Sequence, residues 1–256
     1  MAAAERQPEN AAPRMLLLRP RQRLAADVES CRAAGWQGVP FAPLEAQPLS
    51  DTLAALPQQL AQSAAAFWVS PTAVEIAAPA AFSGSLKALP HVAVGAATAA
   101  ALHAAGAQNV VFDPAGKDSE SAARLPIWRT LPAGAQVLVV RGESGRGHLA
   151  AELAAVGLRP HFAPVYRLAP LALDWQLFCN PPPQAVWLTA LQCADAMLAQ
   201  LPAELAQSAQ SLLYFTHHER IRRGLLERGM ARVFCVADLP AAFAAYGSLK
   251  ARFGAA

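Results

Sequence analysis

Several features that often reveal function are scarce in this chain of 256 residues. Charged residues make up 15% of it, and its 21 Lys and Arg against 18 Asp and Glu leave a net charge of only +3. Non-specific binding to nucleic acid requires many phosphates to be neutralised, so this small excess argues against a nucleic-acid partner. The four cysteines are widely spaced and form no CxxC pair. They are better explained as buried structural thiols than as a metal or redox site.

Long apolar runs are also missing. The longest uncharged stretches, 52–74 and 88–112, are interrupted by proline and polar residues, unlike a membrane-spanning helix. No secretory hydrophobic segment follows residues 1–14. We therefore expect a cytoplasmic protein without a membrane partner. Hydrophobic residues, many of them alanine, still make up 54% of the chain, which excludes wholesale disorder.

The sequence contains an internal duplication, visible as three matched pairs of segments in the same order. A strand, an arginine, a helix, a glycine and a short strand with Phe-Ala-Pro run from 16 to 45 and again from 138 to 166. The other two pairs match 67–74 with 186–193, and 91–113 with 212–238. Such a repeat predicts two similar structural units.

Each unit alternates a short apolar strand with an alanine-rich helix, which is typical of a parallel sheet covered by helices on both faces. The predicted fold class is therefore α/β. Gly35, Gly106, Gly157 and Gly229 each follow a helical stretch, where a left-handed residue commonly ends the helix.

Ligands of such sheets collect at the carboxyl ends of the strands, where the N-termini of helices present unpaired N–H groups. The residues expected there are almost all polar or glycine, which suits an anionic ligand. They are Arg19, Ser70, residues 95–98, residues 141–146, Tyr166, Thr189 and residues 216–218.

Each of these candidates has a plainer alternative. Ser70 and Thr98 are equally explained as helix caps, and Tyr166 as a core tyrosine. The run Gly-Glu-Ser-Gly-Arg-Gly at 142–147 is either an anion-binding loop or a flexible turn, and it lacks a Walker lysine. Ser144 lacks the GxSxG context of a hydrolase nucleophile. His217 and His218 lack HExxH spacing, so contact with a ligand is favoured over a metal site.

Two arginine clusters are each explained either by a solvated helix face or by an acidic small-molecule ligand. They comprise Arg14, Arg19, Arg21 and Arg23, and Arg220, Arg222, Arg223, Arg228 and Arg232.

From Met15 to Phe243 the chain resembles the uroporphyrinogen-III synthase family in its proteobacterial form. The resemblance depends on seven motifs in the right order: Leu18-Arg19-Pro20, FWVSPTAVE at 67–75, VGAATA at 94–99, DSES at 118–121, VVRGESGR at 139–146, PVYR at 164–167 and HERI at 218–221. Leu18, Thr72 and Ala190 depart from the family pattern, in which Thr, Asn and Ser are usual.

The resemblance implies an α/β fold of two flavodoxin-like three-layer lobes with parallel sheets, joined by a two-stranded ladder. One lobe would comprise 1–38 plus 168–256, and the other 39–167, with linker strands at 39–45 and 161–167. It also implies a monomer that needs no cofactor and no metal and converts hydroxymethylbilane, a linear tetrapyrrole, into a macrocycle with its last ring inverted.

The site expected from this resemblance binds the carboxylate arms through helix N-termini, hydroxyls and arginines, with Tyr166 assisting departure of the hydroxyl. The expected substrate-binding residues are Arg19, Ser70, Gly95, Thr98, Arg141, Gly142, Arg146, Thr189, His218 and Arg220. Two alternatives remain at this point. One is a two-lobed binding module for an anionic metabolite or a linear tetrapyrrole. The other, which Ala190 favours, is an accessory protein of tetrapyrrole synthesis without activity.

Overall fold

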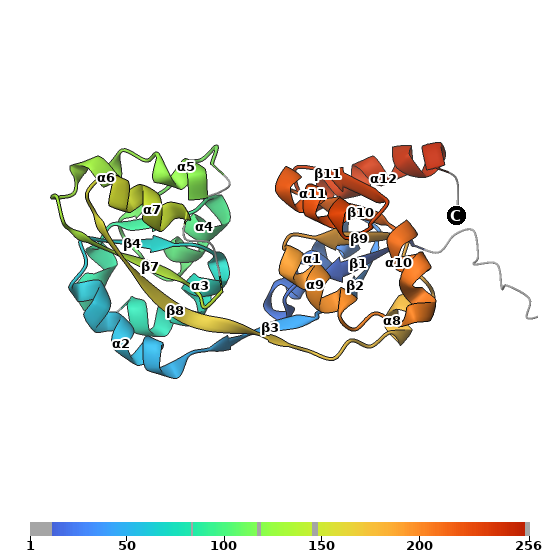
Figure 1. The fold of residues 1–256 in the computed structure, drawn as a ribbon, viewed down its shortest axis with the longest axis horizontal. Coiled ribbons are helices and arrows are strands. Elements are labelled where there is room, and N and C mark those ends of the chain that lie inside the picture. The colour runs from blue at the N-terminus through green and yellow to red at the C-terminus, as the bar shows by residue number, and fades with distance from the viewer. Residues whose placement is uncertain (1–11, 83, 117–118, 145–147, 254–256) are drawn as a thin grey trace, which may run out of the picture. The chain divides into compact units, whose positions relative to one another are not determined.

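The computed structural model describes residues 12–82, 84–116, 119–144 and 148–253. The chain divides into two compact units, Met1–Glu45 with Ala169–Ala256, and Ala46–Leu168 (Figure 1). Each unit contains a sheet with parallel strands and helices on its faces. The predicted α/β class is confirmed.

In the first unit the strands lie in the order β11-β10-β9-β1-β2, and every pairing between neighbours is parallel. The strands are β1 (Arg14–Leu18), β2 (Gln37–Pro40), β9 (Ala185–Leu188), β10 (Leu213–Thr216) and β11 (Arg232–Cys235). The helices are η1 (Arg21–Arg23), α1 (Leu24–Ala33), α8 (Gln176–Cys179), α9 (Leu191–Leu198), η3 (Ala203–Leu205), α10 (Ala206–Ser211), α11 (Glu219–Glu227) and α12 (Leu239–Phe253).

Strand β1 shows why this sheet forms. Met15 and Leu17 pack on the face that α1 and α12 cover. Leu16 and Leu18 alternate with them and point to the other face. All four side chains are fully buried, because helices cover a parallel sheet on both sides. A continuous apolar strand is the sequence pattern that this arrangement requires.

In the second unit the strands lie in the order β3-β8-β7-β4-β5-β6. They are β3 (Leu44–Pro48), β4 (Ala65–Trp68), β5 (His91–Ala93), β6 (Val110–Val111), β7 (Gln136–Gly142) and β8 (Arg159–Pro170). The helices are α2 (Ser50–Ala61), α3 (Pro71–Ala81), η2 (Gly84–Ala88), α4 (Ala96–Ala104), α5 (Ser119–Ala123), α6 (Ile127–Thr130) and α7 (His148–Ala155). Both boundaries between the units fall inside paired strands, since β3 and β8 are neighbours in the sheet.

The second unit has a core on each face of its sheet. Leu138 and Val140 of β7 pack in a cluster with side chains of α2, α3 and α4. Val137 and Val139 pack on the opposite face with side chains of α5, α6 and α7. The two-residue alternation along β7 therefore assigns each of its side chains to one face.

A buried polar pair joins two strands of the second unit. Trp68 Nε1–H donates to His91 Nδ1 at 3.1 Å, and His91 Nε2 lies 2.9 Å from the carbonyl oxygen of Leu86. Nδ1 accepts, so Nε2 carries the proton and the ring is neutral. Burial lowers the pKa of His91, opposed in part by the bond to Leu86.

Helix ends follow the predicted pattern. Gly35, Gly106, Gly157 and Gly229 have φ between 74° and 91°, which confirms their role as left-handed residues after helices.

Within the described part of the chain, no helix is both long enough and apolar enough to cross a membrane.

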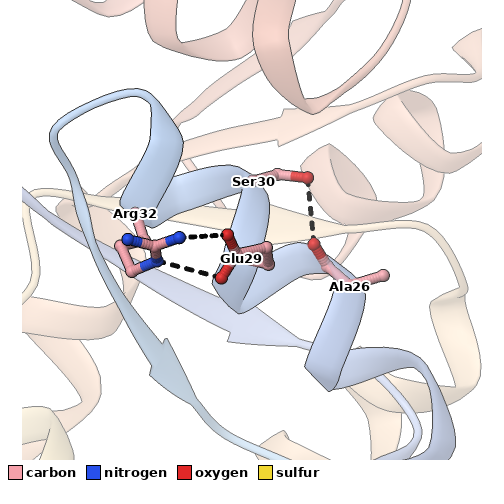
Figure 2. A network of polar contacts seen from close by, with 4 residues as sticks. All are labelled: Ala26, Glu29, Ser30 and Arg32. Carbon is pink, nitrogen blue, oxygen red and sulfur yellow. Dashed lines mark hydrogen bonds and ion pairs between the residues drawn. The ribbon is translucent and has the colours of Figure 1, made fainter.

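The solvent side of α1 has its own polar contacts, which Figure 2 shows. The guanidinium of Arg32 binds the carboxylate of Glu29, three residues earlier, and Ser30 Oγ donates to the carbonyl oxygen of Ala26 at 2.9 Å. Both charged side chains are mostly exposed, so this pair contributes little to stability.

Candidate functional site

The strand order reverses once in each sheet, and these reversals place the candidate site residues. In the first unit, α1 leads from β1 to β2, whereas α9 leads from β9 to β10 in the opposite direction. In the second, the reversal lies between β4 and β7. Ligands of α/β proteins bind at the carboxyl ends of the strands that flank such a reversal.

Arg19 directly follows β1, at the reversal of the first unit. Its side chain is 17% exposed, and its Nη1 forms an ion pair with Asp27 Oδ2 of α1 at 2.7 Å. Burial lowers the pKa of Arg19, and Asp27 raises it in part; burial likewise raises the pKa of Asp27. Nε of Arg19 is buried without a hydrogen-bond partner among the described residues. The strand end thus holds a cation with an unused donor.

Thr189 follows the neighbouring strand β9 and is half-buried. The next residue, Ala190, occupies the N-cap of α9 and forms no side-chain cap. An N-terminus without a side-chain acceptor keeps its dipole and amide groups for an external anion.

His218 is the N-cap of α11, after β10. Its Nδ1 accepts a hydrogen bond from the backbone N–H of Arg220 at 3.1 Å. The Arg220 side chain is exposed. The neighbouring His217 ring lies with its centroid 6.4 Å from that of Trp187. His218 therefore has a structural function at the start of this helix.

Sequence reasoning missed two polar groups of the first unit, Asp27 and the indole of Trp187. Asp27 holds Arg19, and Trp187 Nε1 is buried without a hydrogen-bond partner in the described structure, as is Oγ1 of Thr216, which was expected at the end of its strand. The acidic residue in the first turn of α1 was a usable signal for the ion pair. An apolar strand pattern gives no sign that the indole nitrogen of Trp187 lacks a partner.

In the second unit, Ser70 follows β4 and is the N-cap of α3. Its Oγ accepts from the N–H of Ala73 at 3.2 Å, which confirms the capping interpretation. Gly95 follows β5 and is the N-cap of α4. Thr98 does not cap this helix, because it lies inside the first turn and its side chain is 1% exposed. The capping interpretation of Thr98 was therefore wrong.

Arg141 lies near the end of β7, and its side chain is 9% exposed. Its guanidinium carbon is 5.0 Å from the centroid of the Phe162 ring, and its Nε donates to the carbonyl oxygen of Gly142 at 3.0 Å. A cation over an aromatic face is attracted by the ring's quadrupole. Arg141 is thereby held against its own sheet.

Gly142 ends β7 and touches Tyr166 of the neighbouring strand β8. A Cβ atom on Gly142 would lie 2.8 Å from Cζ of Tyr166. The N–H of Glu143 donates to the carbonyl oxygen of Tyr166 at 2.7 Å. Tyr166 is half-buried and packs against the cluster shared with α3. Arg146 lies outside the described residues.

The structure thus places the described candidates in two sets, one at the carboxyl ends of the strands in each unit. The ends of β1, β9 and β10 carry Arg19, Thr189, His218 and Arg220, and the ends of β4, β5, β7 and β8 carry Ser70, Gly95, Thr98, Arg141, Gly142 and Tyr166. The described residues contain no group of three or more His, Cys, Asp and Glu that could hold a metal. Amides, hydroxyls and guanidinium groups dominate both sets.

Helix N-termini and arginines at the strand reversals of an α/β protein are groups that can bind a small anionic molecule. The family model for "Uroporphyrinogen-III synthase HemD" matches residues 25–244. The chain therefore belongs to the uroporphyrinogen-III synthase family, as the resemblance of its motifs predicted. The family's activity is a cyclisation with loss of water in haem biosynthesis, which is a hydro-lyase reaction.

Solved structures show the same fold. The uroporphyrinogen-III synthetase of Helicobacter pylori 26695 has 18% identity and a TM-score of 0.63, with 93% of this chain and 99% of that chain covered. A mutant uroporphyrinogen III synthase of the extremely thermophilic bacterium Thermus thermophilus has 17% identity and a TM-score of 0.58, with 95% and 100% covered. A comparison with curated proteins gives no match.

Proposed function

We propose that this protein is a uroporphyrinogen-III synthase, which cyclises hydroxymethylbilane with inversion of the last ring and loss of water. The observation that carries the proposal is the family match, which extends over residues 25–244. In this proposal the protein is a cytoplasmic monomer that acts on a small molecule. It needs no cofactor, and neither nucleic acid nor a membrane is its partner.

The finer description of the fold is part of the proposal. Counted along the chain within the first unit, the strand order reads 2-1-3-4-5, which supports a flavodoxin-like lobe. Neighbouring strands β3 and β8, which contain both unit boundaries, support a two-stranded ladder between the lobes. The lobes would be 1–38 plus 168–256 and 39–167; the compact units divide instead after Glu45 and Leu168.

The substrate presents an acetate and a propionate arm on each pyrrole ring. We assign these carboxylates to the helix N-termini after Ser70, Gly95 and Thr189 and to the arginines of the strand ends. Guanidinium groups and backbone amides both form strong hydrogen bonds to carboxylates. Arg19 is assigned to this set because it follows β1 at the strand reversal and its side chain, although paired with Asp27, is 17% exposed.

The chemistry begins when the hydroxyl of the first ring leaves. Tyr166 donates a hydrogen bond to the leaving oxygen, and the hydroxyl departs as water with the proton of the first ring's N–H, which leaves an electrophilic azafulvene. The proton lost from carbon when the ring later recloses restores that N–H. The last ring attacks through its already substituted α-carbon and gives a spiro intermediate. That intermediate breaks its older bond and recloses through the other α-carbon, with loss of a proton, so the ring ends inverted.

Direct closure without inversion competes with this path, so the enzyme has to control geometry more than acid–base strength. Holding two ends of a flexible molecule close to their reacting arrangement supplies about 7 to 11 kcal/mol in well-oriented systems. Several carboxylate contacts on one substrate provide such control. Loss of any single contact is therefore expected to reduce the rate only partly.

The test is to incubate the purified protein with hydroxymethylbilane, oxidise the products and separate the porphyrin isomers by chromatography. The proposal predicts that the type III isomer dominates. A mixture identical to that of the enzyme-free control contradicts it. Tight binding of hydroxymethylbilane without turnover would instead indicate a binding module.

A second test addresses the accessory-protein alternative, which Ala190 favours because Ser is usual at this position of the family. Expression of the chain in a synthase-deficient strain restores haem synthesis if the protein is the enzyme. An accessory protein without activity would leave the defect in place.

A further inference from the structure

The contact between Gly142 and Tyr166 indicates a function for a residue that forms no side-chain interaction of its own. Gly142 lies two residues after Val140 on β7, so a side chain there would point to the face covered by α3. The Tyr166 ring occupies that space. A Cβ on Gly142 would lie 2.8 Å from Cζ, 2.9 Å from Cε2 and 3.1 Å from Oη of Tyr166.

A β-bulge brings Tyr166 to this face. Arg141 pairs with Pro164, whereas the next residue, Gly142, pairs with Tyr166, so one residue of β8 is left over. Ala163 and Val165 already pack on the α3 face. Tyr166 would face the other side in a regular strand, but it packs against the same cluster as Val165. Bulges commonly redirect a side chain in this way next to active sites.

A backbone hydrogen bond also holds the bulge next to this contact. The N–H of Glu143 donates to the carbonyl oxygen of Tyr166 at 2.7 Å. The main chain of Tyr166 is therefore tied to the residue after Gly142, and the ring folds back over Gly142 itself. A methyl group at 142 leaves the ring no ordinary contact distance unless it moves by about 0.6 Å or more, from 2.8 to 3.4 Å.

We propose that Gly142 is the positioning residue of Tyr166: its missing side chain and the bulge opposite it set where the phenol hydroxyl lies. The contact between the two residues is a property of the structure alone. Only its expected effect on kcat depends on the proposed function. Displacement of a reacting group by about 1 Å can lower the rate by about 100-fold. We expect Gly142→Ala to lower kcat by about 10- to 100-fold with a much smaller change in KM.

The decisive kinetic comparison uses the background Tyr166→Ala, in which the ring is absent. If Gly142 acts through the ring, Gly142→Ala changes kcat less than twofold in that background. If it acts directly on the substrate, the same loss persists there and the inference is overturned. Gly247→Ala is the matched control, because a Cβ at this exposed position of α12 has nothing within 4 Å.

A spectroscopic arm is independent of turnover. The chain has three tyrosines, Tyr166, Tyr214 and Tyr246, so 3-fluorotyrosine labelling gives three fluorine signals, and Tyr166→Phe identifies the one from Tyr166. Gly142→Ala is expected to shift that signal, and Gly247→Ala is not. An unmoved Tyr166 signal overturns the inference even if the enzyme is active, whereas a wild type without type III product overturns only the proposed function.

The last measurement is whether the variants fold. If Gly142→Ala alone fails to fold, the double variant with Tyr166→Ala is expected to fold, because the atoms in conflict are gone. A double variant that also fails to fold overturns the steric account.

Discussion

Replacement of Ser70 by Asp separates two functions of one residue. Ser70 Oγ caps α3 by accepting from Ala73 N–H at 3.2 Å, and we propose that it also lies where a substrate carboxylate binds. Asp caps a helix about as well as Ser, and its charge interacts favourably with a helix N-terminus. The free energy of unfolding is therefore expected to change by less than about 0.5 kcal/mol.

The same charge repels the substrate. Two like charges about 4 Å apart interact by about 1 kcal/mol in bulk water and about 4 kcal/mol near a protein surface. For the half-buried Ser70 we take a value between these limits, about 2 kcal/mol, which lowers kcat/KM by about 30-fold. Ser70→Asn is the control, because it preserves a capping side chain without the charge.

The measurements are urea unfolding and initial rates of type III product formation for the three proteins. We expect equal stability for all three and a rate loss specific to Ser70→Asp. A folded Ser70→Asp enzyme with the same kcat/KM as Ser70→Asn would refute the placement of a carboxylate at this helix.

Three further predictions concern the ion pair, the buried histidine and the tyrosine. Asp27→Asn leaves Arg19 buried without its carboxylate and should lower the free energy of unfolding by about 3 kcal/mol; equal urea midpoints for variant and wild type would contradict this. The pKa of His91 is lowered in the folded protein, so the unfolded chain binds the proton more readily. The free energy of unfolding should therefore fall as the pH drops below about 6.5. Its dependence on pH between 7.5 and 5.5 should be weaker in His91→Gln than in the wild type, and an unchanged dependence would contradict this effect of His91. Tyr166→Phe should lower kcat by about 100-fold at unchanged stability, and full turnover would remove Tyr166 from its proposed function.

The fold class was predictable because its signals are local. The apolar run Met15 to Leu18 places hydrophobic side chains on both faces of its strand. A parallel sheet covered by helices buries both faces. Gly35 and Gly157, in matching positions of the duplicated segments, both adopt positive φ. Alternating apolar strands and glycine-terminated helices therefore indicated the architecture without any knowledge of the site.

Contacts that depend on register were not predictable. The Tyr166 ring reaches Gly142 only because a bulge adds one residue to β8, and residues 159–170 contain no glycine that would mark the bulge. Asp27 in the first turn of α1 was a signal for an acidic partner of Arg19, but the spacing alone does not determine the geometry of the turn across which the pair forms. Thr98 was interpreted as a helix cap, but Gly95 is the N-cap of that helix and Thr98 is buried within its first turn.

The most direct test of the central claim follows individual bonds. Hydroxymethylbilane is labelled with ¹³C at the hydroxymethyl carbon and at the unsubstituted α-carbon of the last ring. Direct closure joins the two labels and produces a one-bond carbon–carbon coupling in the product. Inverting closure joins the hydroxymethyl carbon to the other α-carbon, so the product of this protein is predicted to lack that coupling. A product that shows the coupling at the level of the enzyme-free control would contradict the account.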